Sequence, residues 1–351
     1  MAPKSDDSND VQVIHSSGDN ESELPFKDRM VIRAVKQWQS TRIWVYNKEY
    51  QTIFGNTSSF WIKTSIYYFF FYICLGLFYS GMVAVFAAIL SRESPRYLFH
   101  NSQMSIKGNV YPGVGFRPMP DMTSTSVTLY NDTASINNTV ATLRGYVAVF
   151  LTQYDTTYLS DCSPTAPASQ LQAGFSCKLS WTDVVTTETH PCSDTNLYGW
   201  GTGMPCMLIK LNKIYGWLPQ TGSIAIQVAN FTGQPVSPID QREQNIYITC
   251  NGKEASDKAA LGPMIYYSLL SPLGNSNYGG LPYYFFPYMN AKDSVEPFVL
   301  VQFTSLPLEQ KITIQCRAWA PNIEQFSQGS TMRGIAEFDI TKTNKLGPQS
   351  T

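Results

Sequence analysis

Cysteine is the residue type with the clearest chemistry in this chain. The sequence holds seven cysteines, and one of them, Cys74, lies inside a long apolar segment. The other six all follow that segment: Cys162, Cys177, Cys192, Cys206, Cys250 and Cys316. An even number of cysteines confined to one side of an apolar segment is typical of disulfides formed in an oxidising compartment. Six cysteines allow fifteen pairings, and their spacing alone does not choose among them.

Asparagines in Asn-X-Ser/Thr sequences are the second group of candidate sites, because they accept N-glycans in exported domains. Asn131, Asn137 and Asn230 lie after the apolar segment and are predicted to be glycosylated. Asn20 and Asn56 match the same pattern before the segment. We expect these two to stay unmodified if that part of the chain faces the cytoplasm.

Residues for catalysis or metal binding do not form a recognisable pattern. The three histidines are far apart, and no D-x-D sequence follows the apolar segment, as a membrane-anchored glycosyltransferase would commonly require. The acids Glu337 and Asp339 alternate within a strand-like segment, which favours an exposed strand edge. Asp155 and Asp161 are lone acids in predicted loops. We therefore expect no metal, no cofactor and no enzymatic activity. A net charge of −1 also argues against a nucleic-acid partner.

The apolar segment decides the class of protein. Residues 64–91 contain no charge, and the part from Ile66 to Leu90 would span about 37 Å as a helix, enough for a hydrocarbon core of about 30 Å. The lysines and arginines gather before it: Lys27, Arg29, Arg33, Lys36, Arg42, Lys48 and Lys63. Only Arg92, Arg96 and Lys107 occur in the twenty residues after it. The excess of positive charge predicts a single-pass type II protein with its N-terminal segment in the cytoplasm.

The sequence divides into four parts on this basis. Residues 1–63 are the expected cytoplasmic tail, in which 1–26 are polar, acidic and predicted to be disordered. Within the tail, 27–40 has apolar residues at helical spacing among basic ones, which predicts an amphipathic helix at the inner membrane surface or a short, partly ordered segment. Residues 64–91 are the membrane helix. Residues 92–125 are expected to form an extracellular stalk, and 126–351 a disulfide-bonded domain.

The last part is predicted to be mainly β, since short runs rich in Val, Ile, Thr and aromatics are separated by Gly, Pro, Asn and Ser. The expected strands are 126–130, 143–152, 206–214, 223–230, 244–250, 298–306, 311–319 and 334–341. Residues 251–297 are expected to be a long excursion. Cys250 and Cys316 both fall on the apolar face of an alternating strand. A bridge between two sheets, as in an immunoglobulin-type sandwich, is the natural pairing for them.

An ordered set of motifs runs through the chain. Before the span stand Tyr46-Asn-Lys-Glu-Tyr50 and Ser59-Phe-Trp-Ile-Lys63, and within it Tyr68, Tyr72, Cys74-Leu75 and Gly81. After it come Pro205-Cys-Met-Leu-Ile-Lys-Leu-Asn-Lys-Ile214 with Gly216, Phe285-Phe-Pro-Tyr288, Leu300-Val-Gln-Phe-Thr-Ser-Leu306 and Ile314-Gln-Cys-Arg-Ala318. With the six cysteines, this set resembles the β subunits of Na⁺/K⁺-ATPase and H⁺/K⁺-ATPase from about Trp44 to Ile340. The acidic tail, and Phe285 and Phe286 where the family has tyrosines, indicate a divergent, invertebrate-type member.

The resemblance implies a non-catalytic accessory subunit that assembles one-to-one with the catalytic α subunit of a P-type pump, stabilises it, permits its export to the plasma membrane and modulates its K⁺ and Na⁺ affinity. It also implies an immunoglobulin-like exterior domain with disulfides in sequence order: Cys162–Cys177, Cys192–Cys206 and Cys250–Cys316. Membrane lipid and a small single-span regulatory subunit are further candidate partners.

The expected contacts with the α subunit lie in two places. In the membrane they are Tyr68, Tyr72, Gly76 and Gly81, because phenol hydroxyls in lipid need a partner and glycines permit close helix approach. Outside the membrane they are Phe286, Pro287 and Tyr288. The alternative for these three is an aromatic cluster within the domain itself.

Two alternative functions remain open. The chain could serve an H⁺/K⁺-ATPase rather than a Na⁺/K⁺-ATPase, or it could be a type II adhesion glycoprotein that acts without a pump. The adhesion hypothesis predicts surface export in the absence of an α subunit, whereas the pump hypothesis predicts retention.

Overall fold

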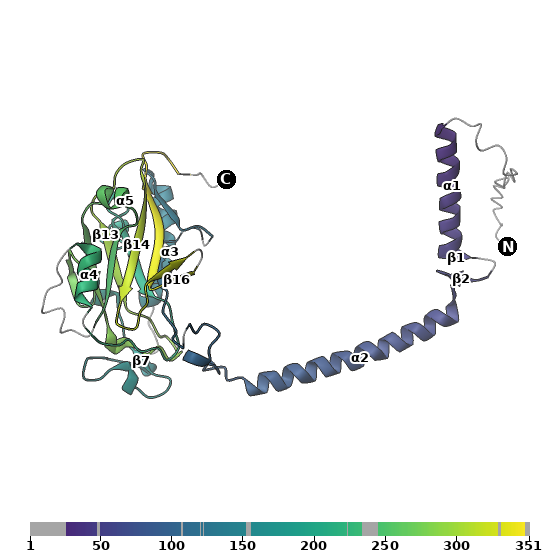
Figure 1. The fold of residues 1–351 in the computed structure, drawn as a ribbon, viewed down its shortest axis with the longest axis horizontal. Coiled ribbons are helices and arrows are strands. Elements are labelled where there is room, and N and C mark those ends of the chain that lie inside the picture. The colour runs from purple at the N-terminus through teal and green to yellow at the C-terminus, as the bar shows by residue number, and fades with distance from the viewer. Residues whose placement is uncertain are drawn as a thin grey trace, which may run out of the picture. The chain divides into compact units, whose positions relative to one another are not determined.

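The computed structural model describes residues 26–47, 50–106, 108–119, 121, 123–151, 156–222, 224–233, 245–328 and 331–347. The chain separates into two units, Met1–Ile89 and Leu90–Thr351 (Figure 1). The predicted disordered tail lies outside the described residues, apart from Phe26.

The first unit consists of two helices and the short turn structure between them. Its elements are α1 (Phe26–Val45), β1 (Tyr46–Asn47), β2 (Thr52–Ile53), β3 (Asn56–Thr57) and α2 (Ser58–Ile89). The indole N–H of Trp61 donates to the carbonyl of Ile53 at 2.7 Å, and the rings of Trp44 and Phe54 lie 5.2 Å apart. These aromatic residues thus connect the small turn to the two helix ends that flank it.

Helix α2 is the one described helix that is long and apolar enough to cross a membrane. Its 32 residues correspond to a length of roughly 48 Å, and none of them is buried within the chain. The predicted segment 64–91 therefore lies almost wholly within a continuous helix, which begins earlier, at Ser58.

Two five-stranded sheets form the second unit (Figure 1). In spatial order the first contains β11 (Ser271–Asn275), β10 (Met264–Ser268), β13 (Phe298–Phe303), β8 (Cys206–Leu211) and β4 (Val114–Arg117). The second contains β12 (Gly279–Pro282), β9 (Asn245–Gly252), β14 (Lys311–Trp319), β17 (Ile335–Lys342) and β5 (Ser126–Leu129). All neighbours in these two sheets are antiparallel except β17 and β5, which are parallel.

Smaller elements surround the sheets. The helices are α3 (Thr133–Leu151), α4 (Ala225–Thr232) and α5 (Ala255–Ala260), and the short strands are β6 (Leu159–Ser160), β7 (Ser176–Cys177), β15 (Phe326–Gln328) and β16 (Thr331–Arg333). Single 3₁₀ turns occur at Phe99–Asn101, Thr156–Tyr158, Ala168–Gln170, Trp181–Asp183, Leu197–Gly199 and Tyr283–Phe285.

The two sheets pack face to face over one hydrophobic core. The ring of Phe116 on β4 stacks on that of Phe338 on β17, with centroids 4.7 Å apart. Near the other edge, Gly279 on β12 comes so close to β13 that a Cβ atom would lie 2.2 Å from Val299. Only glycine permits this approach of the two sheets.

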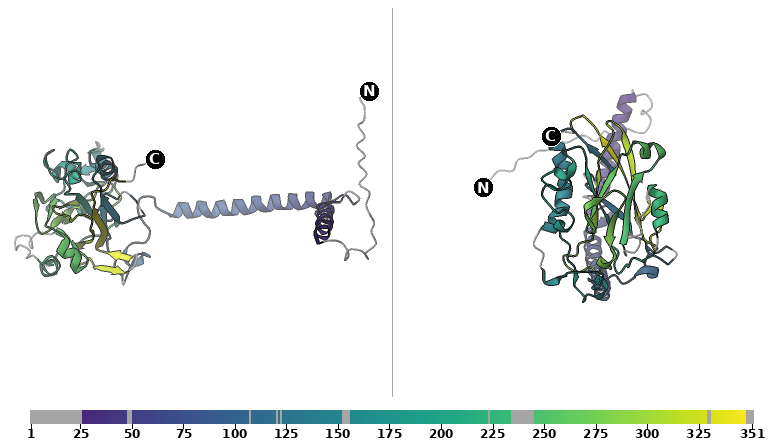
Figure 2. Two further views of the ribbon diagram at one scale, coloured as in Figure 1. Left: turned by 90° about the horizontal axis from the view of Figure 1, so that it is seen from above. Right: turned by 90° about the vertical axis from the view of Figure 1, so that its left-hand side faces the viewer.

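Helices cover the outer faces of the sheets (Figure 2). The ring of Phe150 on α3 lies 5.0 Å from that of Phe298 on β13, so this strand is covered on both sides and every one of its six residues is buried. On the other side, Val228 of α4 packs in a separate cluster with Tyr247 and Trp319 of the second sheet.

Four sequence-based expectations about this unit are wrong. Residues 143–152 and 223–230 were predicted to be strands from their β-branched content, but they fall largely in α3 and α4. In α3 the buried residues Val140, Leu143, Val147 and Phe150 recur at helical spacing. Residues 251–297 are no excursion, since they supply β10, β11 and β12 to the sheets. The expected stalk, 92–125, includes β4, which pairs with β8 inside the domain.

Candidate functional site

The tyrosines of α2 form the first of two separate candidate contact surfaces. The rings of Tyr68 and Tyr72 stack with centroids 6.1 Å apart, and both side chains are exposed. Gly76 follows by another four residues, and nothing lies within 4 Å of the position a Cβ would take there. Residues four apart share a helix face. Tyr68, Tyr72 and Gly76 therefore present one continuous stripe, in which the backbone is open at the glycine.

The same geometry separates Gly81 from this stripe. Gly81 follows Tyr72 by nine residues, or two and a half turns, which places it on the opposite side of α2. It is equally open, with nothing within 4 Å of its Cβ position. A single neighbouring helix cannot cover both. Tyr79 instead continues the stripe, because it lies seven residues after Tyr72, and its side chain is exposed. The helical period could have identified Tyr79 from the sequence.

Outside the membrane helix, the predicted contact residues do not behave alike. Phe286 is only 7% exposed and packs edge-on against the ring of Trp217, 5.7 Å away. It belongs to the core of its own domain, as the alternative hypothesis of an internal aromatic cluster expects. The half-buried Pro287 follows it through a cis peptide bond.

Tyr288 is the member of this group that remains partly accessible. Its hydroxyl donates to Oδ1 of Asn290 at 2.8 Å, and the ammonium of Lys213 lies 4.8 Å from its ring centroid. Its carbonyl accepts a hydrogen bond from the N–H of Gly216 at 2.9 Å. Partial burial raises the pKa of the Tyr288 phenol. The ring is thus held in a fixed position while Met289 and Asn290 beside it are exposed.

The first residues after the membrane helix reach this same place. A cavity of about 350 Å³ is lined by Ser91–Pro95 together with Lys213, Tyr215, Tyr288 and Asn290. The side-chain amide of Asn290 donates to the carbonyl of Glu93 at 3.2 Å. The exposed surface around Tyr288 is therefore next to Ser91–Pro95, the residues that shortly follow α2 in the chain.

Three disulfides fix the domain that carries this surface. They are Cys162–Cys177, Cys192–Cys206 and Cys250–Cys316, the pairs that the family resemblance implies. Cys74, within α2, forms no disulfide in the described part of the chain.

The place of the third disulfide differs from the prediction. Cys250 on β9 lies directly opposite Cys316 on β14, with Cα atoms 4.0 Å apart, so the bridge joins neighbours within one sheet. The expected link between two sheets is wrong, because strand alternation indicates which face a residue occupies and not which strands are neighbours. A tyrosine makes the link instead. The N–H of Cys250 donates to the hydroxyl of Tyr266 on β10 of the facing sheet at 3.0 Å, and burial raises the pKa of that phenol to about 12.

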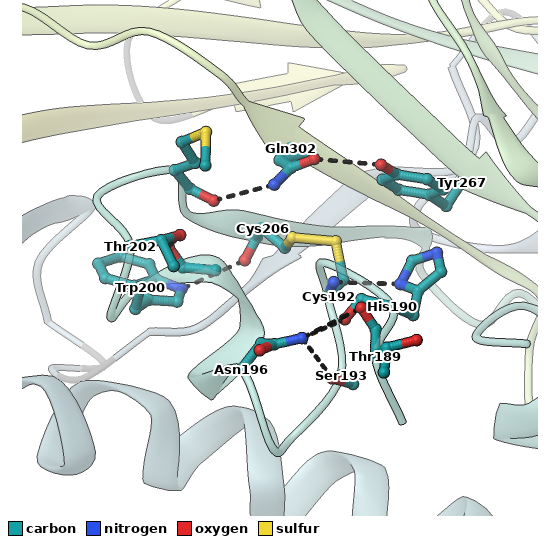
Figure 3. The surroundings of a disulfide bond; sticks show 12 residues. Thr189, His190, Cys192, Ser193, Asn196, Trp200, Thr202, Cys206, Tyr267 and Gln302 are labelled. Carbon is teal, nitrogen blue, oxygen red and sulfur yellow. Dashed lines mark hydrogen bonds between the residues drawn. A yellow bond between two sulfur atoms is a disulfide. The ribbon is translucent and has the colours of Figure 1, made fainter. Parts of the chain in front are cut away.

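The second disulfide has the most elaborate polar surroundings (Figure 3). Nδ1 of His190 accepts a hydrogen bond from the N–H of Cys192 at 3.1 Å, and the indole N–H of Trp200 donates to the carbonyl of Cys206 at 3.3 Å. The imidazole packs edge-on against Tyr267, with ring centroids 4.4 Å apart. Burial lowers the pKa of His190, so its neutral form is favoured. Both sulfurs belong to fully buried residues, which suits a structural bridge.

The predicted glycosylation sites differ in accessibility. Asn131 is exposed in the turn before α3, and Asn230 is exposed on α4. Asn137 lies within α3, where its side-chain oxygen accepts a hydrogen bond from Arg144 at 3.3 Å, and Thr139 of the same sequon is buried. Of the sequons before the span, Asn20 lies outside the described residues and Asn56 is in β3.

The acids considered as catalytic candidates have structural partners. Glu337 pairs with Lys253 at 2.7 Å, and Asp339 pairs with Lys311 at 2.7 Å, all on the outer side of strand β17 and its neighbours. No group of three or more potential metal ligands occurs among the described residues. Asp155 lies outside them, and Asp161 is an exposed loop residue.

Comparison with known proteins agrees with these features. The family model "Sodium / potassium ATPase beta chain" matches residues 33–338. The sodium/potassium-transporting ATPase subunit beta-1 of Drosophila melanogaster is 27% identical over 301 residues, which cover 84% of this chain and 90% of the relative. A probable subunit beta-3 of Caenorhabditis briggsae is 27% identical, with 88% of each chain covered. The sodium/potassium-transporting ATPase subunit beta-1 of Tetronarce californica is 24% identical, and the match covers 84% of this chain and 93% of the relative. The chain belongs to the sodium/potassium ATPase β-chain family.

Proposed function

We propose that this chain is the non-catalytic accessory subunit of a P-type Na⁺/K⁺-transporting ATPase. It assembles one-to-one with the catalytic α subunit, stabilises it, accompanies it to the plasma membrane and modulates its K⁺ and Na⁺ affinity. The proposal rests on family membership together with the exposed tyrosine-bearing face of α2. On this proposal, hydrolysis of ATP and ion binding reside in the partner.

The orientation is type II, with α1 in the cytoplasm and the disulfide-bonded domain outside. Three independent features support it: the excess of lysine and arginine before α2, the six paired cysteines after it, and the exposed Asn131 and Asn230 as glycan acceptors. The exterior domain is an immunoglobulin-like sandwich in the broad sense of two packed sheets. Its intra-sheet disulfide distinguishes it from antibody domains.

In the membrane, the stripe of Tyr68, Tyr72, Gly76 and Tyr79 packs on a helix of the α subunit. The support is chemical: a tyrosine hydroxyl surrounded by hydrocarbon lacks hydrogen-bond partners, and a neighbouring helix can supply them. Gly76 removes side-chain bulk in the middle of the stripe and permits close approach. On this arrangement Gly81 faces lipid or a different neighbour, such as a small single-span regulatory subunit.

Outside the membrane, Tyr288 contacts an exterior loop of the α subunit. The buried Phe286 supports the backbone segment that carries Tyr288. The cavity beside Tyr288 is lined in part by Ser91, two residues after the end of α2, which supports a place for this surface near the outer membrane face. Met289 and Asn290 are exposed there and available for the same contact. The buried Phe286 contributes by fixing the backbone of the cis Pro287 turn.

A pull-down of the tagged full chain in mild detergent, with mass spectrometry of its stoichiometric partners, tests the proposal. We expect one large multi-span P-type ATPase at one-to-one. The identity of that ATPase decides between a sodium pump and a proton pump. Recovery of the glycosylated chain alone from the cell surface would overturn the proposal in favour of a type II adhesion protein.

A further inference from the structure

We propose that α1 lies along the inner membrane surface and binds anionic phospholipid. The inference rests on the proposed orientation, which places α1 in the cytoplasm. It concerns a part of the chain that assembly with an α subunit leaves unexplained: a 20-residue helix whose described side chains are almost all exposed.

Three apolar side chains of α1 share one face, which we call the apolar face. Met30, Ala34 and Trp38 follow one another at intervals of four residues, which aligns them along the helix. Met30 is 57% exposed and Trp38 is 64% exposed, so nothing in the part of the chain that the structure describes covers this face. A tryptophan on such a face suits the boundary between head groups and acyl chains, because the indole is apolar with one polar N–H.

Basic side chains flank this apolar face. Arg33 lies next to Ala34 on one side, and Arg42, four residues after Trp38, lies on the other. The guanidinium of Arg42 is 5.7 Å from the Trp38 ring centroid, so its charge sits at the edge of the apolar face. No acidic residue occurs between Met30 and Val45. An apolar stripe bordered by arginines is complementary to a leaflet with anionic head groups.

The proposed spanning role of α2 places the membrane within reach of α1. Val45 ends α1 and Ser58 begins the spanning helix, and thirteen residue steps cover at most about 45 Å even when fully extended. The span therefore holds α1 at a high effective concentration near the leaflet, so that a weak affinity suffices for binding. This argument favours lipid over a soluble partner, which would have to find the helix by diffusion.

Hydrogen exchange of the full chain, reconstituted in phosphatidylcholine vesicles with and without phosphatidylserine, tests the inference. We expect the amides of α1 to exchange more slowly when phosphatidylserine is present, and the protection to weaken at high salt. The variant Arg33→Gln with Arg42→Gln should lower the binding equilibrium about 25-fold, since one cation near an anionic surface contributes about 1 kcal/mol, or about fivefold. Lys36→Gln, on the far side of the helix, is the matched charge control and should change it less than fivefold.

A second pair of variants, one test and one control, examines the apolar face. Trp38→Gln removes a large exposed side chain from the stripe and should abolish the protection. Ile43→Gln removes one from the opposite side, nine residues after Ala34, and should leave it intact. Equal exchange in both vesicle types would overturn the inference. Protection that requires an α subunit, or that rises with the density of this chain in vesicles without phosphatidylserine, would also overturn it, in favour of a protein contact.

Failure of the proposed function can be distinguished from failure of this inference. A chain that binds no pump but keeps the phosphatidylserine-dependent protection defeats the pump proposal and retains this inference. A glycan attached at Asn20 or Asn56 would show that the orientation itself is wrong, and α1 could then not face the inner leaflet.

Discussion

The apolar helix α2 and the disulfide-bonded domain obtain their order from different sources. No residue of α2 is buried within the chain, and Tyr67, Phe71, Tyr68 and Tyr72 stack in pairs along the surface of the helix itself. In the domain, the central strand β13 is buried along its whole length, and three disulfides cross-link the loops and strands around it. A helix in lipid satisfies its backbone by itself, so the side chains of α2 are available for a partner, whereas those of the domain are committed to its fold.

This contrast separates two kinds of variant. Substitutions in the domain core should change folding and only then affect assembly. Substitutions on the tyrosine stripe should change assembly and leave folding intact. The four predictions below test that separation, beginning with the largest expected effect.

Removing the third disulfide should cost the most. Replacing both Cys250 and Cys316 by serine opens a closed loop of 66 residues, which the chain-entropy model values at about 4 kcal/mol in the free energy of unfolding. Such a loss is a large fraction of the stability of an ordinary domain. Urea unfolding of the purified full chain, followed by tryptophan fluorescence, measures the change.

Two control variants accompany the urea unfolding measurement. Replacing both Cys162 and Cys177 opens a loop with a separation of only 15 and should cost about 3 kcal/mol. Phe70→Ala on α2 should leave the urea midpoint of the domain unchanged, because that side chain is exposed in the span. A midpoint for the Cys250 and Cys316 variant equal to that of the unmodified chain would show that the bridge is dispensable.

The difference between the two regions also explains how far the sequence could predict them. The apolar segment can be recognised in the sequence because residues 64–91 lack any charge. This is a local property, which does not depend on which segments lie beside it in the fold. The strand around Cys316 was equally clear from its alternation. The inter-sheet placement of Cys250–Cys316 failed because strand order depends on non-local pairing, which alternation does not encode.

Two helices were missed for a related reason. Val147 and Phe150 belong to a run of β-branched and aromatic residues, and local propensity favoured a strand. Only the period of the buried positions, extended back to Val140, identifies α3. At the candidate site, the family resemblance implies Tyr68 and Tyr72 as contacts, and their spacing of four predicts that they share one helix face. The same period places Tyr79 on that face. The burial of Phe286 could not be predicted, because it depends on Trp217, which is distant in sequence.

Removing the tyrosines should weaken assembly without unfolding the domain. Tyr68→Ala with Tyr72→Ala deletes two hydroxyls and two rings from the exposed stripe of α2. Hydrogen bonds between membrane helices contribute about 0.6 to 2 kcal/mol each, so the affinity for the α subunit should fall roughly tenfold or more. Quantitative co-purification measures this, with Phe70→Ala on another face as the control. Unchanged assembly and unchanged K⁺ dependence of the pump would contradict the packing of this stripe.

The two glycines of α2 allow a finer test of which face the partner covers. Gly76→Leu inserts a bulky side chain into the tyrosine stripe and should lower assembly by a few-fold to tenfold, because close helix approach is lost. Gly81→Leu adds the same side chain on the side opposite Tyr72 and should have little effect. Equal sensitivity at both positions would mean that α2 is enclosed on two sides, as a partner helix together with a regulatory subunit would do.

The smallest expected effect lies in the domain, at the buried His190. Burial lowers its pKa in the folded chain, whereas an unfolded histidine titrates near about 6.5. The unfolded chain therefore binds the proton more readily, and folding stability falls as the pH drops below about 6.5. Linkage limits the slope for one proton to about 1.4 kcal/mol per pH unit. His190→Gln should reduce the loss of melting temperature between pH 8 and pH 5.5, whereas His100→Gln, at an exposed position, should not. An identical pH dependence in both variants would mean that the proton is taken up elsewhere, and that the hydrogen bond from Cys192 to Nδ1 survives acidification because the imidazole stays neutral.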